Sequence, residues 1–192
     1  MKLRDICLIQ SGLVTSRKDV NKTNLPLIKQ YKLLTLKCLN ETGDLNHNFI
    51  ESFDSCEVLD NKYLTKKNDI IVGSPFPFHS ITIKDNEEGI LIPTNLIIIR
   101  LKDHKKFKPE YISIFLNSDL AKDKFLEELR NFTSPSIKKS NLENLEVKSL
   151  DLDSQINLIG LYKLHKEEKK LLSQLLVEKD FLNKNTVNKI LK

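Results

Sequence analysis

Residues 154–182 read SQINLIGLYKLHKEEKKLLSQLLVEKDFL, and this stretch determines how the rest of the sequence is interpreted. It contains no proline and one glycine, Gly160. Its leucines recur at spacings of three, four and seven residues, which predicts a continuous α-helix with one apolar stripe. Ser154 is expected to cap this helix, with Asp153 near the positive end of the helix dipole. The leucines of the stripe are Leu161, Leu164, Leu171, Leu175 and Leu182.

The length of the predicted helix indicates that it needs a partner. At 1.5 Å per residue, the 29 residues span about 43 Å, which is longer than the side of a domain built from the 150 residues before them. We therefore expect the far end to project and to pair with the same helix of a second copy, giving a homodimer. The alternative is a helix that folds back along its own domain.

The first 150 residues show the pattern of a small α+β domain. Short apolar runs predict strands at 33–36, 69–72, 81–83, 89–93 and 95–100. Pro109 opens a predicted helix over 109–116, and Ser118 can cap a second helix over 119–130. A helical turn at 141–145 and a last strand at 146–150 are expected to follow.

Composition is consistent with a folded chain in two parts. The 192 residues are 40% hydrophobic and 30% charged, so they can bury a core without disulfides or metals. The fold class predicted from these patterns is α+β. A mixed β-sheet domain with small helices is expected over residues 1–150, followed by a long coiled-coil-like helix over residues 151–192.

Charge is unevenly distributed along the sequence. The formal net charge is +5. Residues 1–40 hold eight Lys or Arg and two Asp, whereas residues 41–70 hold three Lys and seven acids. Residues 154–192 hold eight Lys and four acids. Local basic patches permit binding to a polyanion, but a lysine-rich, solvated surface explains the same charges.

Several protein classes lack support in the sequence. No apolar run reaches the roughly 18–20 residues that cross a bilayer, and no apolar segment follows the N-terminal charges as in a secretory signal. The three cysteines, Cys7, Cys38 and Cys56, lack CxxC spacing and are typical of cytosolic thiols. Because the four histidines are scattered, no metal site is expected. The sequence therefore predicts a cytoplasmic protein without a membrane partner.

Catalytic motifs are also missing. The five glycines are too far apart for a dinucleotide-binding turn or a phosphate-binding P-loop. The ExK spelling at 146–148 has no Pro-Asp before it, and it lies in a predicted strand, so a nuclease site is not favoured. The pair His79-Ser80 lacks a GxSxG elbow. We therefore expect no enzyme activity and no cofactor.

Two polar loops carry side chains suited to DNA. The first, GSPFPFHS at 73–80, follows a predicted buried strand, and the second covers residues 131–140. Hydroxyls, amides and lysines are the groups that meet phosphates and base edges, although most polar loops are simply solvated. Basic residues of the first 40 are expected nearby. The candidate DNA-binding residues are Ser74, Phe76, His79, Thr133, Ser134, Ser136, Lys138 and Lys139.

The order of these elements resembles the DNA specificity subunit of type I restriction–modification systems over nearly the whole chain. KLRDICLIQSG at 2–12 is similar to the opening segment of that family, which has a Leu-x-Asp-Ile start and ends in glycine. LTKKNDII at 64–71 is similar to its Leu…Lys-x-Gly-Asp-Ile-Leu segment. Asn68 stands where the family usually has glycine, and asparagine also tolerates a left-handed turn.

Further matches follow in the same order. NLIIIR at 95–100 is similar to an Asn…Arg strand of the family, and YISIFLNS at 111–118 to its Tyr-Leu…Leu-x-Ser helix. NLENLEV at 141–147 resembles the approach to the conserved helix, and Gln155-Ile156 resembles the start of that helix. The chain departs from the family at 150–155, where LDLDSQ lacks the usual proline.

The resemblance implies a non-catalytic half-subunit. Full-length members carry two target recognition domains and two long conserved helices, and this chain has one of each. Its domain would read one half of a split target in double-stranded DNA, and its helix would act as spacer and as dock for methyltransferase subunits. Antiparallel pairing of two copies would rebuild the two-fold arrangement. The implied partners are double-stranded DNA, a methyltransferase (modification) subunit and, where one exists, a restriction subunit.

A second interpretation belongs to another class of protein. The same elements suit a coiled-coil interaction or anti-restriction protein that occupies methyltransferase subunits without reading DNA. Strong, sequence-specific retention of DNA would separate the two interpretations.

Overall fold

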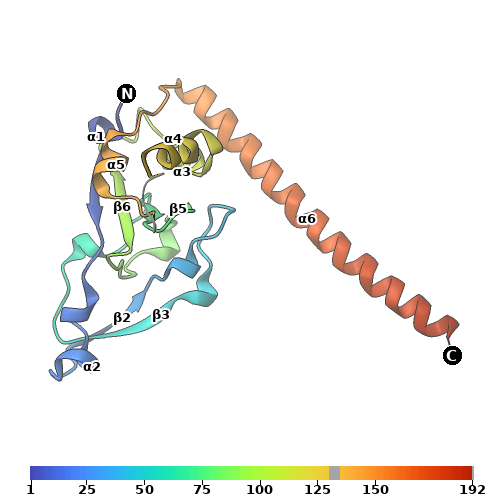
Figure 1. Ribbon diagram of the computed structural model, residues 1–192, viewed down its shortest axis with the longest axis horizontal. Helices are drawn as coiled ribbons and strands as arrows, with labels where there is room; N and C mark the ends of the chain where they lie inside the picture. Colours follow the sequence, from blue (N-terminus) through green and yellow to red (C-terminus); the bar gives the residue numbers. More distant parts are fainter. Residues whose placement is uncertain (130–134, 192) are drawn as a thin grey trace.

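One helix, α6 (Leu152–Ile190), leaves the body of the protein and extends far beyond it (Figure 1). The computed structural model describes residues 1–129 and 135–191. The strands in this part of the chain are β1 (Cys7–Ser11), β2 (Lys29–Leu33), β3 (Glu51–Ser55), β4 (Ile70–Gly73), β5 (Ser80–Thr82) and β6 (Leu96–Leu101). The other α-helices described are α1 (Leu3–Ile6), α2 (Val20–Thr23), α3 (Pro109–Asn117), α4 (Asp119–Leu129) and α5 (Lys139–Asn144).

A four-stranded sheet in the order β1-β6-β4-β5 forms the centre of the domain. All neighbouring strands pair antiparallel, with Ile70 opposite Ile99 and Ile71 opposite Ile98. Where a mixed sheet is expected from the sequence, the described strands pair only antiparallel, and the parallel contacts are two isolated bridges outside these pairings, Leu13–Pro93 and Leu33–Leu91. The structure confirms the predicted α+β class, with a sheet domain followed by a long C-terminal helix.

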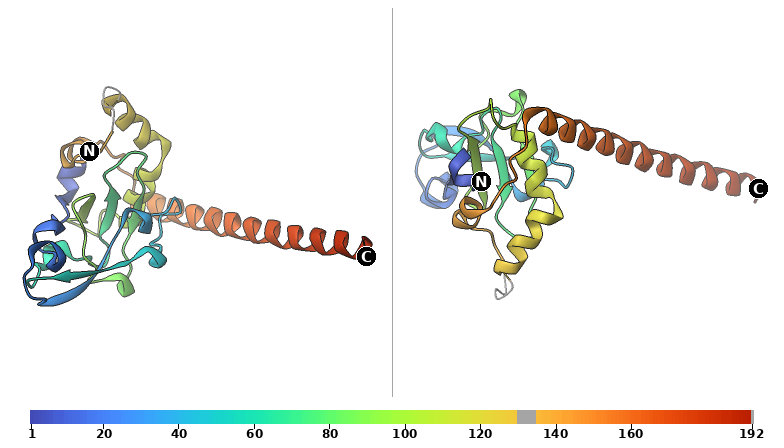
Figure 2. Two further views of the ribbon diagram at one scale, coloured as in Figure 1. Left: turned by 60° about the horizontal axis from the view of Figure 1, so that its bottom comes forward. Right: turned by 90° about the horizontal axis from the view of Figure 1, so that it is seen from above.

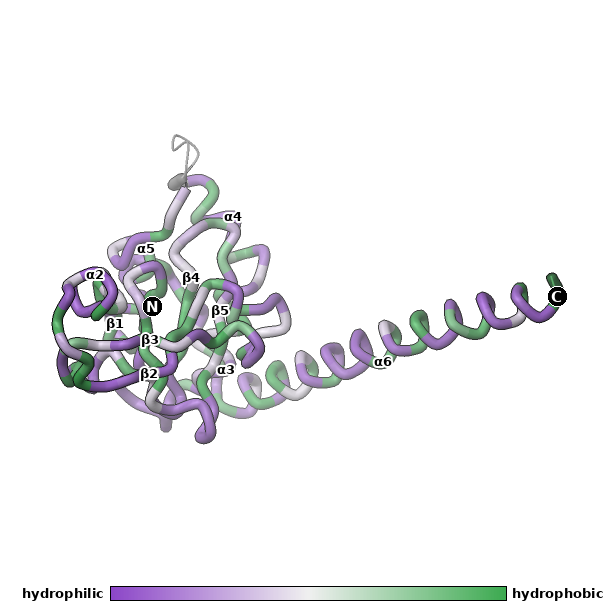
Figure 3. Tube along the Cα trace, turned by 90° about the horizontal axis from the view of Figure 1, so that it is seen from below, coloured by the Kyte–Doolittle hydropathy of each residue, from purple (hydrophilic) through white to green (hydrophobic). Residues whose placement is uncertain are grey.

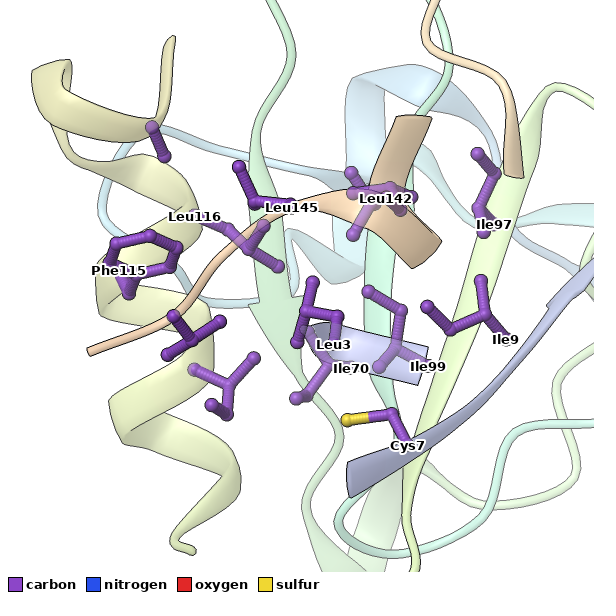
Figure 4. Close-up of a cluster of buried hydrophobic side chains, with 14 of the residues drawn as sticks. Leu3, Cys7, Ile9, Ile70, Ile97, Ile99, Phe115, Leu116, Leu142 and Leu145 are labelled. Atoms are coloured by element: carbon purple, nitrogen blue, oxygen red, sulfur yellow. The ribbon is translucent and has the colours of Figure 1, made fainter. Parts of the chain in front are cut away.

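Both faces of the sheet are buried, because side chains alternate along each strand. One face of β4 and β6 carries Ile70, Ile97 and Ile99, which pack against α1, α3, α4 and α5 in the cluster drawn in Figure 4. The opposite face carries Ile71 and Ile98, which pack against the loop segments around residues 34–45 and 90–92. Two-sided burial explains why these strands are continuously apolar in the sequence instead of alternating.

A second, two-stranded sheet lies at the end of the domain remote from α4 (Figures 1 and 3). Strands β2 and β3 pair antiparallel, with Tyr31 opposite Phe53, and both rings are buried with Leu91. The Tyr31 hydroxyl accepts a hydrogen bond of 2.9 Å from the backbone N–H of Leu59. This small cluster packs the two-stranded sheet against Leu91 of the domain.

An ion pair between Asp69 and Arg100 joins two of the segments that resemble the family, 64–71 and 95–100. Arg100 on β6 donates from Nε to Asp69 Oδ1 at 2.8 Å and from Nη2 to Asp69 Oδ2 at 2.9 Å. The second nitrogen also donates to the carbonyl oxygen of Leu64 at 3.0 Å. Asp69 is only 3% exposed, so the pair is largely desolvated. Just before it, Asn68 has a φ of 67°, the left-handed conformation expected of a residue in a glycine position.

The helices after β6 begin close to where the sequence places them. Pro109 is the first residue of α3, and the Ser118 hydroxyl accepts a 3.4 Å hydrogen bond from the backbone N–H of Ala121 in α4. The strand expected at 146–150 is absent from the described residues, which show only an isolated bridge between Lys2 and Glu146 there. Its backbone pairs with residues 1–3 through Leu145 and Val147, and the carbonyl oxygen of Lys148 then accepts a hydrogen bond from the Tyr111 hydroxyl at 2.6 Å instead of continuing a ladder.

Helix α6 is longer than predicted, and its cap lies earlier in the sequence. Asp151 is the N-cap residue, and its carboxylate accepts hydrogen bonds of 2.8 Å from both the N–H and the hydroxyl of Ser154. The prediction of Ser154 as cap was wrong, because an aspartate three residues earlier offers two oxygens to the first turn. The helix then runs to Ile190, 39 residues in all, or about 58 Å.

Gln155 attaches α6 to the domain. Its side chain is fully buried, an unusual environment for an amide. Nε2 donates to the carbonyl oxygens of Lys106 and Leu150, both at 2.9 Å, and Oε1 accepts from the N–H of Lys108 at 2.9 Å. Ile159, one turn later, is also buried, and the Lys166 ammonium still contacts the Asp44 carboxylate of the domain. The C-terminal part of the helix extends away from the domain (Figure 2).

Along its exposed length α6 mixes hydrophilic and hydrophobic residues in every turn (Figure 3). Among the described residues, no helix combines the length and apolar character that a membrane span requires.

Candidate nucleic-acid interface

The structure brings the two candidate loops together. Pro75 and Ser136 form an isolated antiparallel bridge. Around it, the N–H of Phe76 donates to the carbonyl oxygen of Pro135 at 3.0 Å, and the N–H of Ile137 donates to that of Ser74 at 2.7 Å. Residues that are 60 positions apart in the sequence therefore share one short stretch of paired backbone.

Two candidate side chains in the first loop make internal contacts. The Ser74 hydroxyl donates to the carbonyl oxygen of Ile137 at 2.9 Å, so it joins the two loops. The Phe76 ring is partly buried against the main core and lies edge-on to Phe78, with ring centroids 6.1 Å apart. Both residues act in the first place by holding the shape of this surface.

The far end of the first loop is fixed to the helices. Phe78 is 1% exposed and packs edge-on against Phe125 of α4, with centroids 5.4 Å apart. Asn117 of α3 holds the backbone of Ser80 on both sides: Oδ1 accepts from the Ser80 N–H at 2.8 Å, and Nδ2 donates to the Ser80 carbonyl at 2.8 Å. His79 lies between these two anchors, so its backbone position is well defined.

The His79 side chain is half-buried and has charged neighbours. Burial lowers the pKa of His79 below its ordinary 6.5, and the Lys122 ammonium on α4 lowers it further, while Glu41 acts in the opposite direction. A neutral imidazole offers one donor and one acceptor, which suits a base edge better than a phosphate.

The second loop is described in part. Ser136 is half-buried, whereas Lys138 and Lys139 are exposed at the start of α5. The Lys139 ammonium lies 3.4 Å from the Glu143 carboxylate, an exposed ion pair within one turn of the helix. Thr133 and Ser134 lie outside the described residues.

The basic residues of the first 40 are divided between two places. Arg4 donates to the Asn144 side chain of α5 at 3.3 Å, so it lies beside the second loop. Lys22 and Lys29 belong to α2 and β2, at the end of the domain remote from α4 (Figures 1 and 3). The expectation that these residues gather near the loops therefore holds for Arg4 and not for that end of the domain.

Sequence reasoning missed Lys122, Glu41 and Asn117 as neighbours of His79. Lys122 and Asn117 occur in ordinary helical patterns, and Glu41 lies in an acidic stretch. Nothing in their local sequence signals that they converge on one loop.

The leucine stripe of α6 is unpartnered in this chain. Its five leucines are between 47% and 71% exposed. At about 100° per residue, they lie on the side of the helix roughly opposite to Gln155 and Ile159, which pack on the domain. The domain therefore leaves this stripe open along its whole length.

Within residues 1–127 and 135–191, no three His, Cys, Asp or Glu side chains gather in a way that would hold a metal ion.

No protein-family model matches the sequence, and no curated protein matches it. Solved structures do match. The HsdS subunit from Thermoanaerobacter tengcongensis superposes with a TM-score of 0.70 at 14% sequence identity, over 93% of this chain and 44% of that subunit. The S subunit of a type I restriction–modification system from M. genitalium superposes with a TM-score of 0.51 at 18% identity, over 95% of this chain and 43% of that subunit. This chain therefore spans less than half the length of these proteins, and its fold is that of a type I restriction–modification specificity subunit.

Proposed function

We propose that this protein is a sequence-specific DNA-binding specificity subunit of a type I restriction–modification system. Residues 1–150 form the target recognition domain, which reads one half of a split target, and residues 151–192 form the spacer and dimerisation helix. The observation that supports this most strongly is the superposition on HsdS over 93% of the chain, because it includes the sheet domain together with α6.

The reading surface is the junction of the two loops. His79 and Ser136 are short, directional side chains at this junction and are our candidates for contacts to base edges, together with Thr133 and Ser134. Ser74 and Phe76 hold the backbone on which they stand. Lys138 and Lys139 contact phosphates, since an ammonium group is a point charge that positions a protein without specifying a sequence.

The functional unit is an antiparallel homodimer through α6. The leucine stripe is centred near Leu171, so a two-fold axis there brings Leu161 close to Leu182 of the partner subunit. The two domains then lie at opposite ends of the paired helices and read the two halves of a palindromic, spaced site.

Methylation and cleavage belong to partner subunits. A methyltransferase subunit docks on the helices, and a restriction subunit joins where the system has one. Residues 1–153 carry 23 basic and 22 acidic groups, a net charge of only +1, so DNA binding by the chain alone is weak and tightens with the methyltransferase partner. The chain alone neither methylates nor cuts DNA in the presence of Mg²⁺ and S-adenosylmethionine.

The direct test is selection of bound duplexes from a random-sequence DNA library, with the full chain alone and with a methyltransferase subunit added. We expect a palindromic motif of two short half-sites separated by an unspecified spacer. Recovery of no motif, with tight binding to the methyltransferase subunit, would instead support a decoy that does not read DNA.

Lys138→Ala combined with Lys139→Ala tests the placement of the loops. Each phosphate contact contributes about 0.9 to the slope of log K against log salt, so the slope should fall by about one to two, equally for selected and unrelated duplexes. Fluorescence anisotropy titrations at several salt concentrations measure this slope. His79→Ala should instead change the selected sequence. An unchanged slope in the lysine variant would show that the second loop does not contact the DNA.

A further inference from the structure

A basic groove lies where α6 passes the domain. It has a volume of about 650 Å³ and runs between the helix and two domain segments, around residues 42–44 and Lys84. Thr42 and Ser173 add hydroxyl groups to its lining. Five of the lining residues are lysines: Lys84, Lys163, Lys166, Lys169 and Lys170. We refer to these five residues as the lysine groove.

The acids of this groove do not neutralise it. Asp44 is the acid between the domain and the helix, with Lys84 at 3.2 Å and Lys166 in direct contact. Burial by itself would raise the pKa of Asp44, but the hydrogen bonds from these two lysines outweigh it and hold the pKa below its ordinary value. The other lining acid, Glu167, lies 3.7 Å from Lys170. Five lysines against two acids leave a net charge of +3.

Two of the lysines have no acidic partner in the described part of the chain. Lys163 and Lys169 are exposed, and no carboxylate of residues 1–127 or 135–191 lies within ion-pair distance of either ammonium group. Their charges are therefore available to a ligand without breaking an existing pair.

The groove and the leucine stripe lie on different sides of α6. The lysines follow the side that begins with Gln155 and Ile159 and faces the domain, while the stripe faces away from it. Dimerisation through the leucines therefore leaves the lysines uncovered.

The groove is also close to the proposed reading surface. Gly43, which lines the adjoining cleft, lies next to the Asn117 side chain, and Asn117 holds the backbone of Ser80. Glu41, in the same loop, is close enough to His79 to affect its pKa. One loop, residues 41–44, thus connects the lysine groove to His79.

We propose that the lysine groove binds the sugar–phosphate backbone of duplex DNA beyond the half-site read by the domain. This inference rests on the proposed function and adds a sequence-independent contact to it. A compact row of ammonium groups with few acids complements a polyanion, and it reads no bases. Lys163 to Lys170 lie about 16–27 Å along α6 from its first residue, so the row of ammonium groups spans about 10 Å of the helix.

The test compares two double variants of the full chain with the same change in charge. Lys163→Gln with Lys169→Gln removes the two unpaired lysines of the groove. Lys22→Gln with Lys32→Gln removes two exposed lysines of α2 and β2, at the other end of the domain. Each protein is titrated by anisotropy with a random-sequence 40-base-pair duplex over a range of salt concentrations.

We expect the groove variant to lower the salt slope on the 40-base-pair duplex by about two, and the control variant to change it by less than half a unit. Equal slopes for wild type and groove variant on this duplex would overturn the proposal, even if library selection had returned a motif. Failure of the wild-type chain to retain any duplex, with or without its methyltransferase partner, would overturn the proposed function as well.

Discussion

Replacing Gln155 with leucine tests whether buried hydrogen bonds hold α6 on the domain. Leucine fills a similar volume but can make none of the three hydrogen bonds of the amide. The carbonyl oxygens of Lys106 and Leu150 and the N–H of Lys108 then lose their partner in a site where Gln155 is fully buried. Each unsatisfied buried group costs about 1–3 kcal/mol.

The total loss of stability in the Gln155→Leu variant is smaller than three full penalties. A buried leucine is more favourable than a buried amide, and water can reach the site once the helix loosens. We expect the free energy of unfolding to fall by about 3 kcal/mol. Urea unfolding followed by circular dichroism measures this loss, and limited trypsin digestion should show faster cleavage at the lysines of α6 near the domain.

Gln30→Leu is the matched control. Gln30 is exposed, and its side-chain amide donates a hydrogen bond of 2.8 Å to the Asp54 carboxylate on the paired strand β3. This change should cost less than about 0.5 kcal/mol, as surface substitutions usually do. A Gln155→Leu protein within 1 kcal/mol of the wild type, with unchanged trypsin cleavage, would show that the amide does not hold α6 in place.

Three further predictions follow from the structure. Leu171→Asp with Leu175→Asp should convert a dimer to a monomer in analytical ultracentrifugation, because charges would be buried at the helix seam; a wild-type chain that is monomeric at high micromolar concentration would refute the pairing. Asp69→Ala should cost about 3 kcal/mol in urea unfolding by leaving Arg100 unpaired, whereas a loss below 1 kcal/mol would mean that the pair is not a structural element. The pKa of His79 is below 6.5 in the folded chain, so as the pH falls the unfolded chain takes up the proton at a higher pH than the folded chain does. The free energy of unfolding should therefore fall as pH drops through and below 6.5. His79→Asn should flatten this dependence relative to the wild type.

The elements were predictable where local chemistry decides them. The β-branched run at 95–100 and the proline at 109 led directly to β6 and α3. Asn68 stands at a family glycine position and tolerates a left-handed turn, and its φ of 67° is left-handed. In each case the deciding signal lies within a few residues of the sequence.

Features that depend on distant partners were not predictable. The segment 146–150 has a strand-like pattern, but its backbone pairs only as far as Val147, and the next carbonyl, that of Lys148, accepts from the Tyr111 side chain. Gln155 was noted only as a family residue, and nothing in its neighbours indicates that its amide meets three backbone groups from two other segments. The loops at 73–80 and 131–140 were chosen separately by composition, and their pairing depends on tertiary folding.

The backbone pairing of Ser74 and Phe76 with Pro135 and Ile137 limits how such a surface can be re-engineered. Three hydrogen bonds cross between the two loops, and two of them use only main-chain atoms. A loop grafted from another protein in place of residues 73–80 would have to form the same backbone hydrogen bonds with Pro135 and Ile137 of the second loop, with which it did not evolve. The smallest exchangeable cassette is therefore both loops at once; if the proposed reading surface is correct, a new specificity would be inherited as a discontinuous pair of segments and not through stepwise replacement of either one.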